Sequence, residues 1–221
     1  ELIPEPGVEA LSQVPGQLEM LSLVLADGHR VGLVDEDVRR LQDRPDILDC
    51  MNRYTRGADR LDRELLLSAY HPDATDDRGA FTGGPEARVD WLLAFLRTLG
   101  HTSHNISNFT IEIDGDVAHT ESYVITTRLP AEGGTVTMGC ARYIDRFERR
   151  DEGGWRIAHR EAVMDFEFTV AESNLPPKVL SGARDCTDRS YARPLTLSPE
   201  GEARLGARPP AGRKRWSRAG G

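Results

Sequence analysis

The sequence predicts an α+β fold in which three helices near the N-terminus pack on a curved, mainly antiparallel sheet. In residues 47–58 and 89–99, apolar side chains recur every three or four positions, as on one buried face of a helix. After residue 101 the period changes to two, and short loops containing glycine or proline separate four β-rich segments: 102–113, 117–129, 135–149 and 155–168. Such loops join antiparallel neighbours, and helices followed by strands are typical of α+β domains.

The first 34 residues precede the periodic part and are expected to form an N-terminal extension. Two apolar runs in this extension flank Asp27-Gly28, a pattern that predicts a β-hairpin. Asp35 is expected to cap a short helix that ends at Leu41. Pro45 then suits the first turn of a separate, longer helix, the first of the three.

The helix after Pro45 carries the apolar stripe on which the candidate site depends. Its positions recur at steps of four, three and four residues: Ile47, Met51, Tyr54 and Ala58. Tyr54 therefore faces the interior, and Asp59 follows where the helix is expected to end. An unbroken helix would splay these two side chains by about 140°, so a shared site predicts that the helix ends or bends near Gly57.

Two more helices are expected before the sheet. Asp62 is expected to cap one that stops before His71, and residues 73–84 are rich in turn-forming residues around one short extended piece. Pro85 suits the start of the third helix, and Gly100 is expected to be its C-cap.

The first strand supplies a partner for Asp59, because a buried carboxylate is costly without one. Alternation places His104 and Ile106 on one face of that strand. An inward His104 beside Asp59 would form a dyad in which the carboxylate fixes the imidazole tautomer, and Tyr54 would donate a proton or polarise a carbonyl. The alternative is structural: a hydrogen bond that ties helix to sheet, and a core tyrosine with a satisfied hydroxyl.

Composition argues against several other classes of protein. The chain has 36 acidic and 28 basic residues, which disfavours a general affinity for nucleic acid. Its three cysteines form no CxxC pair, and no signal peptide or apolar run long enough for a membrane span is visible, so a cytoplasmic location is expected. His101 and His104 lie three apart on a strand and face opposite ways, so we expect no metal site. No cofactor is expected either. Residues 170–221 are expected to form an irregular C-terminal extension with a basic, disordered tail.

Four segments together resemble one known family: RYTRGADRLD, YHPDATDDRGAFTG, HNISN and YIDRFERRDEGGWRIAHR. With the order of elements, they make the chain similar to the SnoaL-like group of the nuclear transport factor 2 superfamily across residues 35–169. The resemblance implies a cone-shaped α+β barrel. It also implies kinship with polyketide cyclases, scytalone dehydratase, a bile-acid dehydratase and a dehydrochlorinase.

In the dehydratase branches of this family an aspartate past the first long helix pairs with a histidine after the third helix, and these positions match Asp59 and His104. A tyrosine five residues before the aspartate matches Tyr54. The resemblance therefore implies a lyase, most concretely a dehydratase, of secondary or xenobiotic metabolism that acts on a mid-sized, largely apolar molecule. A cyclase, an isomerase or epimerase, and a non-catalytic ligand-binding or assembly subunit remain alternatives.

Five further residues are candidates for substrate contact: Met51, Trp91, Glu121, Arg128 and Arg142. Glu121 and Arg128 are the candidates for the place of the second acid of the dehydratase site. An inward Arg142 would indicate an acidic group on the substrate, whereas an outward one would have no role.

We also expect a homodimer or homotrimer. Helices that cover one face of a four-stranded sheet leave the other face without cover. The residues expected there are Phe109, Ile111 and Ile113.

Overall fold

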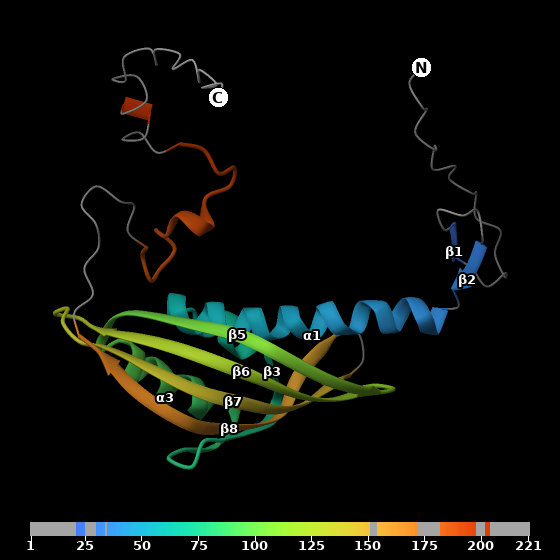
Figure 1. Cartoon of the computed structure of the whole chain (residues 1–221), viewed down its shortest axis with the longest axis horizontal. Coiled ribbons are helices and arrows are strands. Elements are labelled where there is room, and N and C mark those ends of the chain that lie inside the picture. Colours follow the sequence, from blue (N-terminus) through green and yellow to red (C-terminus); the bar gives the residue numbers. More distant parts are fainter. Residues whose placement is uncertain are drawn as a thin grey trace, which may run out of the picture.

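The computed structural model describes residues 21–24, 30–33, 35–150, 154–171, 182–197 and 202–203. Three helices lie against one six-stranded sheet, which curves around them (Figure 1). The elements are α1 Asp35–Arg60, α2 Arg63–Ser68, β3 Tyr70–Asp77, β4 Thr82–Gly83, α3 Pro85–Leu96, β5 Leu99–Asp114, β6 Val117–Pro130, β7 Val136–Arg149 and β8 Trp155–Val170. The predicted α+β class and the three helices are confirmed. None of the helices in the described part of the chain is long and apolar enough to cross a bilayer.

The sheet has the strand order β4-β3-β8-β7-β6-β5. Strands β5 to β8 form the predicted antiparallel meander, but β3 adds to β8 in parallel and makes the sheet mixed. The turn-rich interpretation of residues 73–84 was therefore wrong for Asp73 to Asp77. Two features hide this strand in the sequence. Its acidic residues are poor strand formers, and Pro72 lies where the pairing with β8 is irregular.

The N-terminal extension contains the predicted hairpin, in which β1 (Leu21–Val24) pairs antiparallel with β2 (Arg30–Leu33). The other end of the chain contributes one short helix, η2 (Arg189–Tyr191), within residues 182–197. The basic tail, residues 204–221, for which disorder is predicted, lies outside the described residues.

Helix α1 is one continuous element, not the two helices expected on either side of Pro45. A proline inside a helix removes a hydrogen bond and costs about 3 kcal/mol. Contacts beside the proline oppose that cost. The Asp43 carboxylate accepts a hydrogen bond of 2.8 Å from the Trp155 indole, and an Arg44 guanidinium nitrogen donates to the Phe109 carbonyl at 3.3 Å.

The predicted bend at Gly57 is absent, because α1 runs through Gly57 to Arg60. The helix then ends in a Schellman turn. The amide of Asp62 donates to the Gly57 carbonyl, the amide of Leu61 donates to the Ala58 carbonyl, and Leu61 has a φ of 56°. Asp59 thus occupies the last turn of the helix. A Cβ atom on Gly57 would lie 2.8 Å from both the Cγ atom and the backbone nitrogen of Leu66. Glycine lets α2 pack closely on α1.

We expect the Gly57→Ala variant to lose stability although alanine is the better helix former. Alanine gains about 1 kcal/mol of helix propensity, but overpacking against a backbone atom costs about 1–3 kcal/mol. Urea unfolding followed by circular dichroism should therefore show a lower unfolding free energy. Asn52→Ala, on the exposed side of the same helix, is the matched control and should not lower it. A Gly57→Ala protein as stable as the wild type would contradict the close packing.

Helices α2 and α3 largely follow the sequence pattern. The Asp62 carboxylate accepts a hydrogen bond from the Leu65 amide, so the predicted cap of α2 is confirmed. Helix α3 begins at Pro85 as predicted but ends at Leu96, before the expected C-cap. Gly100 instead lies in β5, where a Cβ atom would approach the Pro130 carbonyl oxygen to 2.9 Å.

Strand β5 changes the face that it turns to the core partway along its length. The pairing with β6 shifts between Ser107 and Phe109, and Asn108 there has a positive φ of 29°. Such a bulge reverses the alternation of side chains. Before the bulge the even-numbered residues face inward, and after it Phe109, Ile111 and Ile113 pack against the core. This corrects the expectation that these three need cover on the outer face.

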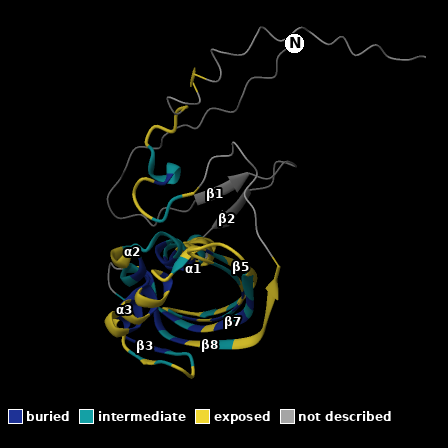
Figure 2. Cartoon of the chain, turned by 90° about the vertical axis from the view of Figure 1, so that its left-hand side faces the viewer, coloured by how far each residue is buried: buried dark blue, intermediate teal, exposed yellow. Residues whose placement is uncertain are grey.

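Other large apolar side chains are exposed on the sheet. They are Tyr123 and Ile125 of β6, Ile144 of β7, and Met164, Phe166 and Phe168 of β8. Figure 2 shows the contrast between the buried residues inside the curved sheet and the exposed end of β8. The homodimer or homotrimer stays a prediction.

Cys50 of α1 is fully buried, and its thiol donates a 3.3 Å hydrogen bond to the Ala69 carbonyl. Burial raises the pKa of this thiol from 9.0 to about 11. Between about pH 9 and pH 11 the Cys50 thiol therefore stays protonated in the folded state, whereas it has lost its proton in the unfolded chain. Cys50 stabilises the protein fully below pH 9, and this contribution of about 3 kcal/mol is lost as the pH rises to 11.

We therefore expect stability to fall between pH 8 and pH 11, and part of that fall to vanish in Cys50→Ala. Urea midpoints of both proteins at the two pH values isolate the cysteine, because other alkaline titrations affect both proteins. Cys186→Ala, which removes an exposed thiol, is the control and should behave as the wild type. An equal loss of stability between pH 8 and pH 11 in the wild type and in Cys50→Ala would refute the role of the Cys50 thiol in the alkaline loss.

Candidate functional site

A cavity of about 240 Å³ lies between α1, α3 and the concave face of the sheet. Much of its wall is apolar and comes from α3 and β8, including Leu92, Phe95, Val163 and Met164. Four of the polar groups in this wall come from four separate segments. They are Tyr54 of α1, Arg78 of the loop after β3, Arg88 of α3 and His104 of β5.

Asp59 and His104 meet at the edge of this cavity, as their positions in the sequence predicted. The Asp59 Oδ1 atom lies 2.7 Å from Nδ1 of His104, and Asp59 Oδ2 accepts a 2.9 Å hydrogen bond from the His104 backbone amide. The two side chains are only 15% and 9% exposed. Both carboxylate oxygens therefore hold the same residue, which fixes the position of the ring as well as that of the strand.

This geometry selects one tautomer of His104. A carboxylate accepts hydrogen bonds, so Nδ1 carries the proton, and Nε2 keeps its lone pair. No other side chain in the described part of the protein hydrogen-bonds the ring. Because the ring lines the cavity, the arrangement is that of a general base whose carboxylate partner stabilises the imidazolium once a proton has been taken.

A segment far along the chain completes the surroundings of Asp59. Thr102 donates a 3.1 Å hydrogen bond to Asp59 Oδ1, and Arg184 in turn donates to Thr102 Oγ1 at 3.2 Å. The same guanidinium donates to the carbonyls of Leu96 and Leu99 at 2.7 and 2.8 Å, where α3 ends and β5 begins. Residues 182–197 therefore tie the end of α3 to the strand that carries His104.

The hydroxyl of Tyr54 lies among arginines. It accepts hydrogen bonds from Arg78 Nη2 at 3.0 Å and from Arg88 Nη2 at 3.4 Å. Burial would raise the pKa of Tyr54, but the charges of Arg78, Arg88 and Arg160 outweigh it and lower this pKa below the ordinary value for tyrosine. No described residue accepts the proton of the Tyr54 hydroxyl. Tyr54 thus has a proton to donate in the wall of the cavity, and the neighbouring charges lower the pKa of its hydroxyl.

Beneath Tyr54 lies a buried ion pair. Arg160 donates two hydrogen bonds, of 2.6 and 2.7 Å, to the two carboxylate oxygens of Asp145, and both side chains are fully buried. The Arg160 guanidinium lies over the rings of Tyr54 and Tyr143, with its carbon 4.5 and 4.1 Å from their centroids. The pair forms the floor on which the two tyrosine rings are held.

Of the five residues predicted to contact substrate, two line the cavity and three do not. Trp91 and Arg128 line the cavity, and Arg128 pairs with Glu167. Met51 does not line it, and its buried sulfur accepts a 3.1 Å hydrogen bond from Arg160.

Glu121 and Arg142 lie outside the cavity, which corrects the role expected of them. Arg142 pairs with Glu121 at 2.9 Å and with Asp165 at 3.0 Å on the opposite face of the sheet. Inward positions of β7 carry Gly139, Ala141 and Tyr143 instead, so the outward alternative for Arg142 is the one that the structure bears out.

Four residues of this site were not identified from the sequence: Arg78, Arg88, Arg160 and Arg184. A signal existed for Arg88, since it precedes Leu92 by four residues and Leu96 by eight, on the apolar face of α3. For Arg160 the signal is misleading, because the register between β7 and β8 shifts near Ala158 and reverses the alternation along β8.

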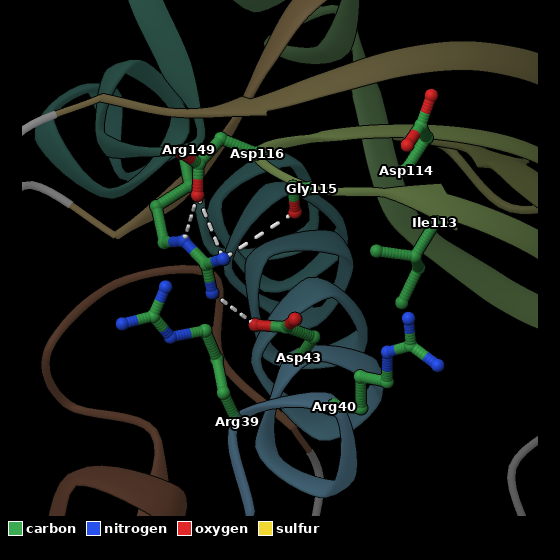
Figure 3. A pocket seen from close by; sticks show the side chains of 8 residues that line it. All are labelled: Arg39, Arg40, Asp43, Ile113, Asp114, Gly115, Asp116 and Arg149. Carbon is green, nitrogen blue, oxygen red and sulfur yellow. Dashed lines mark hydrogen bonds and ion pairs between the residues drawn. The ribbon is translucent and has the colours of Figure 1, made fainter. Parts of the chain in front are cut away.

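A second hollow, of about 400 Å³, lies at the other end of the sheet between α1 and the turn from β5 to β6 (Figure 3). Its walls are charged. Arg149 pairs there with Asp43 and with Asp116, and its guanidinium lies over the Trp155 ring. Those contacts fasten α1 to the strand ends. Within the described residues, no group of three or more His, Cys, Asp or Glu side chains is arranged to hold a metal ion.

Comparisons with known proteins agree with this architecture. The sequence model of the SnoaL-like domain matches residues 39–161, more than half of the chain. An uncharacterised protein of Mycobacterium tuberculosis is 26% identical over 134 residues, which are 59% of this chain and 90% of that protein. A hexachlorocyclohexane dehydrochlorinase, LinA Type2, superposes with a TM-score of 0.58 at 24% identity, over 65% of this chain and 99% of the other. A candidate scytalone dehydratase from Novosphingobium aromaticivorans gives 0.53 at 19% identity, over 66% and 99%.

The two solved structures share the fold at identities too low to carry an activity with them. The match to the domain is of a different kind, because it covers the helices and most of the strands that build the cavity. The chain belongs to the SnoaL-like domain family and has the cone-shaped α+β fold of nuclear transport factor 2-like proteins.

Proposed function

We propose that this protein is an acid/base enzyme, working without a cofactor, that eliminates water or another leaving group from a small, largely apolar molecule. The observation that carries the proposal is the 2.7 Å contact between Asp59 and Nδ1 of His104 in the wall of a cavity that also holds the Tyr54 hydroxyl. A base oriented by a carboxylate and an acidified hydroxyl in one apolar cavity are the two groups that an elimination needs.

In the proposed reaction, Nε2 of His104 takes a proton from a carbon next to a stabilising group. Asp59 stabilises the imidazolium that forms. The electrons of the broken C–H bond form a C=C bond, and the bond to the leaving group on the adjacent carbon breaks. Tyr54 gives its proton to a departing oxygen, which leaves as water. Proton return from His104 to Tyr54, directly or through water, restores the starting state.

The names of two structural neighbours support elimination over other uses of the same base, since a dehydrochlorinase and a scytalone dehydratase both carry out eliminations. The first step is shared with cyclisation and with double-bond shifts, which also begin by removing a proton next to a stabilising group. The mass of the product separates these reactions. Elimination loses the leaving group, whereas a double-bond shift leaves the mass unchanged.

The test is a panel of β-hydroxy ketones, β-hydroxy acids and chlorinated cyclohexanes incubated in deuterated water with the wild type and with His104→Gln. We expect the wild type to form an alkene from at least one compound, or to exchange its acidic C–H for deuterium, at a rate that the variant does not reach. Equal conversion and exchange by the two proteins across the panel would refute the proposed base and favour a ligand-binding or assembly role.

A further inference from the structure

The charges of one buried cluster beside the cavity do not balance. Three arginines, Arg78, Arg88 and Arg160, lie within one cluster with two aspartates, Asp76 and Asp145. Their side chains are no more than 2% exposed, except that Arg78 is 15% exposed. One positive charge is therefore left over in a place where unpaired charge costs several kcal/mol.

The excess charge can be assigned to Arg88. Arg160 is paired with both oxygens of Asp145, although its Nη1 atom has no hydrogen-bond partner within the described residues, and Arg78 donates to both oxygens of Asp76 at 2.7 and 3.2 Å. Arg88 approaches Asp76 only to 3.5 Å through Nε, and within the described residues neither its Nε nor its Nη1 atom has a hydrogen-bond partner. A guanidinium that is 2% exposed and keeps two unused donors is a built half-site for an anion.

The position of Arg88 shows that such an anion would lie in the cavity. Arg88 lines the same cavity as Tyr54 and His104, and its guanidinium lies over the Trp91 and Phe81 rings, 5.1 and 5.9 Å from their centroids. The rings limit its movement, so the donors are held in advance. The other guanidinium at the Tyr54 hydroxyl, Arg78, also lines the cavity. An oxygen anion placed there would meet two guanidiniums.

We propose that Arg88, with Arg78, forms a carboxylate-binding subsite beside the Tyr54 hydroxyl, and that the ligand of this cavity is a small cyclic or aromatic acid whose apolar body rests on Trp91, Phe95 and Met164. A carboxylate fits because the planar guanidinium fork binds two oxygens at once. The excess positive charge is present before any reaction. It therefore favours binding of an anionic ligand in the ground state and not only stabilisation of an anionic transition state. The cavity is smaller than the roughly 300–1,000 Å³ usual for drug-sized ligands, which limits the acid to about one ring and a short chain.

Equilibrium binding tests the subsite without any turnover. Isothermal titration calorimetry of the full chain would use benzoate, cinnamate and cyclohexanecarboxylate, each beside its neutral alcohol. We expect at least one acid to bind about tenfold or more tighter than its alcohol, the range expected for hydrogen bonds to a charged group. Arg88→Met should abolish this preference while leaving the affinity for the alcohol within about threefold. Arg142→Met, which removes an arginine from the outer face, is the matched control and should keep it.

Two results would overturn the proposal. The first is a wild type that binds none of the three acids better than its alcohol; this comparison needs no variant and decides the matter even if Arg88→Met does not fold. The second is a tyrosinate absorption band in the ligand-free protein at neutral pH, because Tyr54 would then supply the missing negative charge.

The identification of the acid as the substrate rests on the proposed function. The binding of the acid to the subsite does not depend on that function. His104→Gln should keep the preference for the carboxylate. Acids that bind to an enzyme whose His104 proves dispensable would disprove the general base and leave the subsite intact.

Discussion

His104→Gln is expected to lower kcat/KM for the elimination by about 10²–10⁴-fold, the usual contribution of a positioned general base. Glutamine can keep a hydrogen bond toward Asp59 but offers no basic nitrogen to the cavity. The Asp59 Oδ2 contact goes to the backbone amide of residue 104, so the strand stays anchored in the variant. The loss should therefore fall on the chemical step, with an unfolding free energy close to that of the wild type.

Asp59→Asn should lower the rate by a similar factor for a different reason. An amide donates through its nitrogen and can hold the imidazole in the wrong tautomer, with the proton on the nitrogen that faces the cavity. His101→Gln is the matched control, since His101 is an exposed histidine of the same strand that does not line the cavity. Rates are compared on the substrate found in the panel. A His101→Gln loss as large as the His104→Gln loss, or wild-type rates in Asp59→Asn, would exclude the dyad.

The dyad was predictable because both of its residues lie where local periodicity still holds. Asp59 is in the last turn of a helix whose apolar stripe is plain, and His104 precedes the bulge at Asn108, so simple alternation turns it inward. The bend expected at Gly57 was unnecessary. Asp59 reaches β5, whereas the Tyr54 hydroxyl meets arginines from elsewhere in the chain, so the two side chains share the site without sharing a helix face.

Beyond a bulge, the same reasoning failed. Asn108 moves Phe109 to the inner face, and the register shift near Ala158 does the same for Arg160. The position of one extra residue depends on pairing with a distant strand, which a single sequence does not reveal. Arg184 was out of reach for another reason. It meets Thr102 from 82 residues along the chain, beyond the residues that match the family.

The largest effect on stability is expected from Arg160→Met. Removing one partner of a buried ion pair costs about 3–5 kcal/mol, because the remaining charge stays buried without compensation. Here that charge is the carboxylate of Asp145, whose two oxygens both accept hydrogen bonds from Arg160. The variant also removes the cation between the rings of Tyr54 and Tyr143. Urea unfolding followed by circular dichroism should show a midpoint far below that of the wild type at unchanged slope.

The double variant Arg160→Met/Asp145→Leu separates the two sources of this loss. If the unpaired Asp145 charge dominates, its removal should restore most of the stability, since replacing a whole buried ion pair by apolar side chains is often neutral. If the stacking on the tyrosines dominates, the double variant should stay as unstable as the single one. Arg142→Met, which breaks exposed ion pairs, should cost less than about 1 kcal/mol. An Arg160→Met protein within that same 1 kcal/mol of the wild type would mean that the arginine does not stabilise the floor of the cavity.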